Sequence, residues 1–167
     1  MSATHLVLGG ARSGKSRHAE ALVEAQPSPW TYIATAQAFD DEMRSRIAEH
    51  RARRPQGWTT IDAPLDLAAA LHQAGNAPVL VDCLTLWLTN LILGEHDVAA
   101  ATASLLETLC TRDGMTALVS NEVGLGIVPD NALARRFRDE AGILHQRIAQ
   151  VADTVIFMVA GLPLKVK

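Results

Sequence analysis

The sequence predicts an α/β protein whose mostly parallel central sheet is covered by helices on both faces. Two observations support this fold class. Short apolar, strand-like runs alternate with amphipathic, helix-like segments throughout the 167-residue chain, which is the pattern of parallel α/β folds. Several of the apolar runs are continuous rather than alternating, as expected for strands buried on both faces. A chain of this length corresponds to about one domain, so we expect residues 1–167 to form a single domain.

The predicted strands are seven short apolar runs between helical segments. In chain order they cover residues 5–9, 31–35, 58–61, 78–82, 115–120, 154–160 and 164–166. The clearest helix covers residues 129–151, and Pro129 and Asp130 suit its start. Its apolar residues recur every three or four positions and so share one helical face; they are Leu133, Phe137, Ala141, Leu144, Ile148 and Val151.

Composition and charge exclude several classes of protein. Hydrophobic residues make up 49% of the chain and charged residues 20%, which is typical of a globular chain rather than a disordered one. The formal net charge of −3 disfavours a protein that coats nucleic acid. The longest apolar stretch, residues 79–93, is too short and too polar to span a bilayer. No signal-peptide pattern is visible, and Cys83 and Cys110 lack metal-site spacing, so we expect a cytoplasmic protein with reduced thiols.

The strongest local motif is Gly-Gly-Ala-Arg-Ser-Gly-Lys-Ser at residues 9–16, which fits the phosphate-binding pattern G-x-x-x-x-G-K-[ST]. It follows an apolar strand and leads into a helix, as the motif requires. Loop N–H groups and the helix N-terminus would bind phosphate oxygens. Lys15 would neutralise the β- and γ-phosphates, and Ser16 would bind Mg²⁺. We therefore expect a P-loop nucleotide-binding domain whose contacts include Gly9, Gly10, Ala11, Arg12, Ser13, Gly14, Lys15 and Ser16.

A second candidate metal ligand ends the strand predicted over residues 78–82. This residue is Asp82. In P-loop proteins a carboxylate at the end of a neighbouring strand helps to hold Mg²⁺, directly or through water. The alternative is that Asp82 caps the helix that follows.

A strongly charged helix is predicted over residues 40–54, and five of the chain's twelve arginines lie in it. One interpretation is a solvated face with ion pairs such as Glu42 with Arg46. The other is a positive surface for a triphosphate. His50 lies in this cluster, where guanidinium charges favour a neutral imidazole that can attack phosphorus. The other histidines have no metal-ligand spacing and are expected to be structural or on the surface; they are His5, His18, His72, His96 and His145.

Eight stretches spread along the chain match one known family. They are Gly-Gly-Ala-Arg-Ser-Gly-Lys-Ser-Arg-His-Ala-Glu (9–20), Tyr-Ile-Ala-Thr (32–35), Asp-Asp-Glu-Met (40–43), Arg-Ile-x-x-His (46–50), Arg-Pro (54–55), Thr-x-x-x-Thr-Asn-Leu (85–91), Asn-Glu-Val-Gly-x-Gly-Ile-Val-Pro (121–129) and Gly-x-x-x-Lys-x-Lys (161–167). In these stretches the chain resembles the bifunctional adenosylcobinamide kinase / adenosylcobinamide-phosphate guanylyltransferases of cobalamin biosynthesis, the CobU/CobP family. The phosphate loop alone is widespread, but its combination with Asn-Glu-Val-Gly is far more specific.

The resemblance implies two reactions on one chain, a RecA-like sheet and a homotrimer. ATP or GTP would phosphorylate the aminopropanol hydroxyl of adenosylcobinamide. GTP would then donate GMP to that phosphate through a covalent intermediate on the matching His50, giving adenosylcobinamide-GDP. At Asp62 this chain departs from the glutamate of relatives, although either acid can accept a hydrogen bond from a base or ribose. Outside the phosphate loop, the family's nucleotide contacts fall on Ala34, Thr35, Ala36, Arg51, Ala52, Arg53, Arg54, Asp62 and Asp82.

The loop over residues 121–129 follows a predicted strand, at the end of the sheet where open α/β folds bind ligands. Glu122 is therefore a candidate to contact cobinamide or to act as the base for its hydroxyl. The alternative is a loop shaped for packing or for subunit contact.

Two other functions fit parts of the sequence. A single-activity P-loop metabolite kinase would leave His50 idle, and labelling with GTP that carries a radioactive α-phosphate would distinguish it. A RecA-like DNA-binding ATPase is disfavoured by the net charge and by the presence of only three lysines, Lys15, Lys165 and Lys167.

Overall fold

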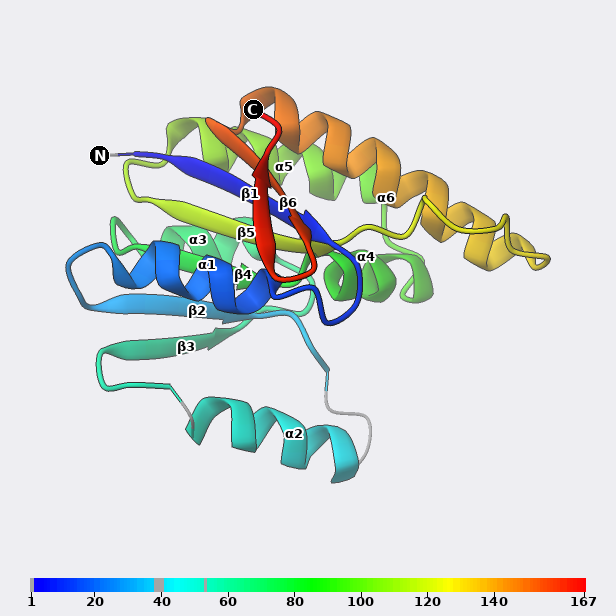
Figure 1. The fold of residues 1–167 in the computed structure, drawn as a ribbon. Helices are drawn as coiled ribbons and strands as arrows, with labels where there is room; N and C mark the ends of the chain where they lie inside the picture. The colour runs from blue at the N-terminus through cyan, green and yellow to red at the C-terminus, as the bar shows by residue number, and fades with distance from the viewer. Residues whose placement is uncertain (1, 38–40, 53) are drawn as a thin grey trace.

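The computed structural model describes residues 2–37, 41–52 and 54–167. Within these residues, seven strands form one sheet in the order β3-β2-β4-β5-β1-β6-β7 (Figure 1). The first six strands pair in parallel, and β7 runs antiparallel to β6. The strands are β1 Thr4–Gly9, β2 Trp30–Ala34, β3 Trp58–Asp62, β4 Val79–Asp82, β5 Thr116–Asn121, β6 Thr154–Val159 and β7 Leu162–Lys165.

Helices cover both faces of this sheet, which confirms the predicted fold class (Figure 1). On one face Ala19 and Val23 of α1 pack against the strands. On the other face α3, α4, α5 and α6 build the larger core around residues such as Trp87 and Leu144. The helices are α1 Lys15–Glu24, α2 Asp41–Ala52, α3 Leu67–Gln73, α4 Leu84–Leu93, α5 Val98–Thr111 and α6 Ala132–Val151. In the described part of the chain, no helix combines the length and apolarity needed to cross a membrane.

The parallel register brings the predicted site residues to one edge of the sheet. Ala34 at the end of β2 lies opposite Asp62 of β3 on one side and Asp82 of β4 on the other. Gly9 at the end of β1 lies opposite Asn121 of β5. The phosphate loop and the two acids therefore share the carboxyl edge of the sheet, where parallel α/β folds bind ligands.

The start of α6 differs from the prediction. Asn131 caps the helix and accepts a hydrogen bond from the backbone N–H of Ala134 at 2.8 Å, so Pro129 and Asp130 precede the helix. Leu133 is 51% exposed although it shares the predicted apolar face. Figure 1 shows the reason, since the first turns of α6 extend past the sheet that buries the rest of that face. Periodicity predicts which face is apolar but not where its packing partner ends.

The last strand begins earlier than predicted because a tight turn follows β6. Ala160 and Gly161 adopt φ values of +51° and +79°, a left-handed conformation that glycine tolerates well. The chain reverses there, and β7 starts at Leu162.

Helix α2 lies beyond the β3 edge of the sheet and not against the phosphate loop (Figure 1). Six of its twelve residues are charged, and none of its described residues belongs to either buried core cluster. A helix that is polar on most sides has no apolar stripe to bury, which explains its position outside the two layers.

Candidate nucleotide site

The phosphate loop joins β1 to α1 with an open helix N-terminus. Gly14 precedes the helix with φ +91° and leaves the first turn without a side-chain cap. Such free N–H groups, together with the helix dipole, suit a phosphate group. Gly9 is required by close packing, since a Cβ there would lie 2.9 Å from the backbone oxygen of Met158 and 2.5 Å from Ser13 Oγ.

The loop is also braced by the turn between β6 and β7. The backbone N–H of Gly161 donates to the carbonyl oxygen of Ser13 at 3.1 Å. The family's C-terminal motif begins at this glycine, but sequence reasoning did not connect it with the phosphate loop. The bracing turn is therefore a part of the site that only the fold reveals.

The side chain of Lys15 is directed back into the phosphate loop. Lys15 is only 8% exposed, and its Nζ donates to the carbonyl oxygen of Gly10 at 2.5 Å. Burial lowers the pKa of Lys15, while the carboxylate of Asp82 acts in the opposite direction. The predicted phosphate lysine and the predicted metal ligand are thus within electrostatic range of each other.

Asp82 is connected to the arginine-rich segment through Tyr32. The Tyr32 hydroxyl donates to Asp82 Oδ2 at 3.1 Å, and the Arg54 guanidinium carbon lies 3.2 Å from the centroid of the Tyr32 ring. Burial, followed by the charge of Asp82, raises the pKa of Tyr32, so its proton stays on the hydroxyl. Arg54 also donates to Thr60 Oγ1 at 3.2 Å. Sequence reasoning had selected both charged residues but not the tyrosine between them.

Thr35 braces the end of β2. It is fully buried; its hydroxyl donates to the carbonyl oxygen of Cys83 and accepts from the N–H of Cys83, both at 2.8 Å. Its own carbonyl oxygen accepts from Asn90 Nδ2 at 2.8 Å. In this structure Thr35 therefore supports the segment after Asp82 rather than presenting a free hydroxyl to a nucleotide.

The remaining predicted contacts are placed only in part. Ala34 is buried, Ala36 is half-buried, and Asp62 is exposed at the end of β3. His50 and Arg51 lie in the last turns of α2, whose end is the exposed Ala52. The side chains of His50 and Arg51, and the whole of Arg53, lie outside the described residues.

Glu122 lies directly beside the phosphate loop. Its backbone N–H donates to the carbonyl oxygen of Gly9 at 2.9 Å, and its Oε1 accepts from the N–H of Gly124 at 2.6 Å. Arg138 of α6 donates to the carbonyl oxygen of Gly124 at 2.6 Å and so anchors this loop to α6. The end of β5 thus brings a carboxylate to the same edge as Lys15.

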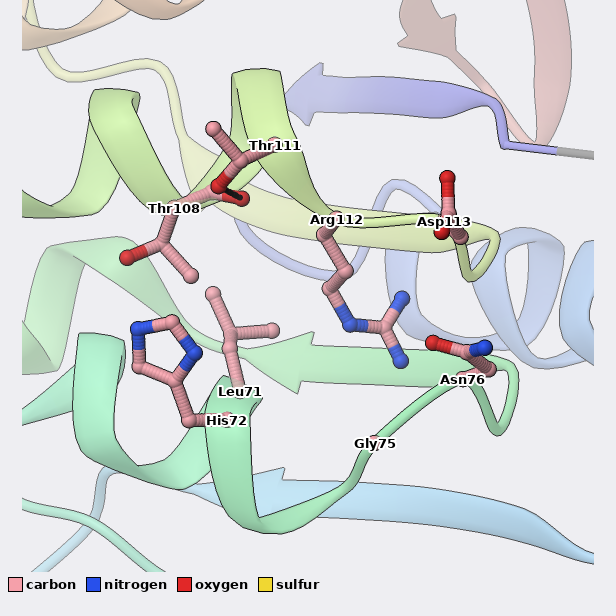
Figure 2. Close-up of a pocket in the computed structure, with 8 residues that line it drawn as sticks. All are labelled: Leu71, His72, Gly75, Asn76, Thr108, Thr111, Arg112 and Asp113. Atoms are coloured by element: carbon pink, nitrogen blue, oxygen red, sulfur yellow. Dashed lines mark hydrogen bonds between the residues drawn. The ribbon is translucent and has the colours of Figure 1, made fainter.

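A cavity of about 160 Å³ lies at the opposite end of the strands (Figure 2). In Figure 2, Arg112 points toward the segment that carries Gly75 and Asn76. Its guanidinium donates to the carbonyl oxygens of Ala77 and Met115 and to Thr116 Oγ1. Arg112 therefore ties the starts of β4 and β5 together, and this cavity is separate from the phosphate loop.

Fold and loop together define a P-loop nucleoside triphosphatase fold of the RecA-like type. A type III secretion ATPase superposes with a TM-score of 0.55 at 13% identity over 98% of this chain and 56% of its own. A KaiC-like protein from Pyrococcus horikoshii superposes with a TM-score of 0.53 at 17% identity over 93% of this chain and 71% of its own. At these identities the likeness concerns the fold alone.

The chain belongs to the cobinamide kinase / cobinamide phosphate guanyltransferase family, whose model matches residues 5–166. It is 55% identical to the bifunctional adenosylcobalamin biosynthesis protein CobP of Pseudomonas aeruginosa, over 97% of this chain and 96% of the relative. It is 43% identical to CobU of Salmonella typhimurium, over 97% and 98% of the two chains. The family resemblance of the sequence motifs is confirmed, and with it the assignment as a kinase and guanylyltransferase of adenosylcobalamin biosynthesis.

Proposed function

We propose that this protein phosphorylates the aminopropanol hydroxyl of adenosylcobinamide with ATP or GTP and then transfers GMP from GTP to the new phosphate. The product is adenosylcobinamide-GDP. The observation that carries the proposal is the buried Lys15 in its phosphate loop, within electrostatic range of Asp82, in a chain of the cobinamide kinase / guanyltransferase family. These are the parts that a phosphoryl-transfer site needs.

In the kinase step, the protein acts by positioning and electrostatics. Lys15 and the loop N–H groups would hold the β- and γ-phosphates and stabilise the negative charge on the leaving nucleotide. Ser16 and Asp82 offer the hard oxygen donors that would hold Mg²⁺, and the ion would supply positive charge that stabilises the charge on the transferred phosphoryl group. Glu122, beside Gly9, would contact the corrinoid substrate and orient or deprotonate the attacking hydroxyl.

In the guanylyl step, His50 would act as the nucleophile. The imidazole nitrogen attacks the α-phosphorus of GTP, so that an N–P bond forms and the bond from phosphorus to the pyrophosphate oxygen breaks. A phosphate oxygen of cobinamide phosphate then attacks the same phosphorus, breaks the N–P bond and regenerates His50. The segment that follows the histidine would contact the nucleotide; it consists of Arg51, Ala52, Arg53 and Arg54.

The position of α2 adds a condition to this step. Since α2 does not lie against the phosphate loop (Figure 1), His50 reaches a loop-bound GTP only if α2 moves or a second chain supplies the histidine.

A homotrimer in the cytoplasm is part of the proposal, supported by the family resemblance. Ala34, Ala36 and Asp62 complete the proposed nucleotide contacts.

Intact-protein mass spectrometry after incubation with GTP tests the histidine intermediate. The wild-type protein should gain the mass of one GMP, and peptide mapping should locate it on His50. His50→Ala should lose the adduct and guanylylation but keep kinase activity, because phosphoryl transfer does not use the histidine. His96→Ala, at an exposed histidine between α4 and α5, is the matched control. An acid-labile GMP adduct on His50→Ala would refute the role of His50, and cobinamide phosphorylation with no adduct on the wild-type protein would favour the single-activity kinase.

A further inference from the structure

Two buried polar side chains near the carboxyl end of β5 have no role in the function proposed above. Ser120 and His145 are 1% and 7% exposed, and His145 Nε2 lies 2.7 Å from Ser120 Oγ. The other ring nitrogen, Nδ1, lies 3.9 Å from Glu122 Oε2. The imidazole of α6 therefore stands between a buried serine and the candidate base of the kinase step.

The tautomer of this imidazole follows from the hydrogen bonds that Thr85, beside Ser120, accepts. Thr85 Oγ1 accepts from the backbone N–H of Asn121 at 2.9 Å and from Asn121 Nδ2 at 3.3 Å. These two donors occupy both of its lone pairs, so Ser120, 3.5 Å away, cannot donate to it as well. Ser120 consequently donates its proton to His145 Nε2.

An imidazole that accepts at Nε2 carries its single proton on Nδ1 when it is neutral. Burial lowers the pKa of His145, more strongly than the charge of Glu122 raises it, which favours this neutral form. The Nδ1–H group then faces Glu122 Oε2. At 3.9 Å this is an electrostatic contact rather than a hydrogen bond.

Both oxygens of Glu122 are thus oriented by the protein. Oε1 accepts from the Gly124 N–H at 2.6 Å, and Oε2 faces the Nδ1–H of His145. The Glu122 side chain is still 23% exposed, so a substrate can reach it. Its backbone is bonded to Gly9 at the start of the phosphate loop, which fixes the carboxylate relative to the transferred phosphate.

We propose that His145, held by Ser120, is a positioning residue that orients the carboxylate of Glu122 toward the substrate hydroxyl in the kinase step. This inference rests on the role proposed above for Glu122. His145 touches neither substrate nor nucleotide and acts only through Glu122, so its effect should disappear when Glu122 no longer carries a carboxylate.

A double-mutant cycle on the kinase step tests this coupling. We measure kcat and the KM values for adenosylcobinamide and for ATP in the wild type, Glu122→Gln, His145→Leu and the double variant. Loss of a general base lowers kcat by about 100-fold, and loss of its orientation should lower kcat by about tenfold with little change in the KM for ATP. The double variant should be no slower than Glu122→Gln alone. Independent, multiplicative losses would overturn the inference.

A conservative pair of variants keeps the test decisive even if His145→Leu does not fold. The amide of His145→Asn places an N–H donor near the position of Nδ1, whereas His145→Gln reaches toward Ser120 and leaves Glu122 without its donor. The His145→Asn variant should therefore retain a higher kcat than His145→Gln at equal stability in urea. A His145→Gln variant as active as His145→Asn would refute the proposal.

If Glu122→Gln leaves kcat unchanged, the proposed role of Glu122 fails together with this inference. If Glu122→Gln is slow but the effect of His145 is independent of it, only this inference fails.

Discussion

The phosphate loop and helix α2 present positive charge in opposite ways. The loop is held from several directions, with Lys15 buried, Gly9 against Met158 and Gly161 bonded to Ser13. In α2 the Asp41–Arg44 ion pair is exposed, with side chains 96% and 60% accessible, and such pairs contribute little to stability. The comparison indicates a cradle that packing preforms and a helix whose place is only weakly fixed by the core. In the proposed mechanism the phosphate loop would hold GTP, and His50 of α2 would accept GMP from it.

The strongest test of this contrast is Lys15→Ala. Removing a preorganised donor from a site of developing charge typically lowers turnover by about 100-fold or more, and we expect both phosphorylation and GMP-adduct formation to fall. Lys165→Ala, on the exposed edge strand β7, is the matched control for charge. A Lys15→Ala protein that still forms the GMP adduct at the wild-type rate would show that guanylylation does not use this cradle.

A pair of small substitutions compares the packing of the two regions. Gly9→Ala forces a Cβ to within 2.9 Å of a backbone oxygen, and such overpacking costs about 1–3 kcal/mol. Ala48→Gly, at an exposed position in α2, costs about 1 kcal/mol in local helix stability and less in the free energy of global unfolding. Urea unfolding of both variants measures the difference. Equal losses would mean that α2 is as firmly integrated as the loop.

Tyr32 lies between Asp82, at the end of β4, and Arg54, two residues after the end of α2, and two variants separate its contacts. Tyr32→Phe loses the hydrogen bond to Asp82 but keeps the ring beneath Arg54. We expect the transition state of the kinase step to lose about 1 kcal/mol of stabilisation, the usual contribution of one hydrogen bond. This loss corresponds to a roughly fivefold lower kcat/KM. Tyr32→Leu also removes the ring and should additionally raise the KM for GTP. If the two variants behave alike, the stacked arginine does not contribute to nucleotide binding.

The parts of the candidate site that are local in the chain can be predicted from the sequence. The phosphate loop is eight contiguous residues between a strand and a helix, so its geometry follows from the motif itself. Asp82 and Glu122 could be predicted because parallel strands bring their carboxyl ends to one edge.

The contacts that the sequence did not predict join residues distant in the chain. Stacking of Arg54 on Tyr32 and the bond from Gly161 to Ser13 depend on strand order, which no local pattern encodes. The contact of His145 with Ser120 could not be predicted either, because it depends on how α6 packs on β5. The exposure of Leu133 depends on where the sheet ends beneath α6.

The smallest expected effect is a loss of stability on mild acidification that originates in two histidines, His5 of β1 and His145 of α6. Burial lowers the pKa of both His5 and His145 below the ordinary value of 6.5, so both are neutral in the folded protein. Below pH 6.5 the unfolded chain binds more protons than the folded one, and the free energy of unfolding therefore falls as the pH falls. The contribution of the two neutral histidines to the free energy of unfolding is complete above pH 6.5. It is lost progressively as the pH falls from 6.5 toward their lowered pKa values.

Urea unfolding at pH 7.5 and 5.5 measures this effect, in a range above that in which most carboxylates titrate. His145→Gln should reduce the difference in unfolding free energy between the two pH values, because glutamine does not titrate. His72→Gln, at an exposed position in α3, should leave that difference unchanged. A difference that is the same in His145→Gln and the wild type would place the acid sensitivity outside the packed region beneath β5.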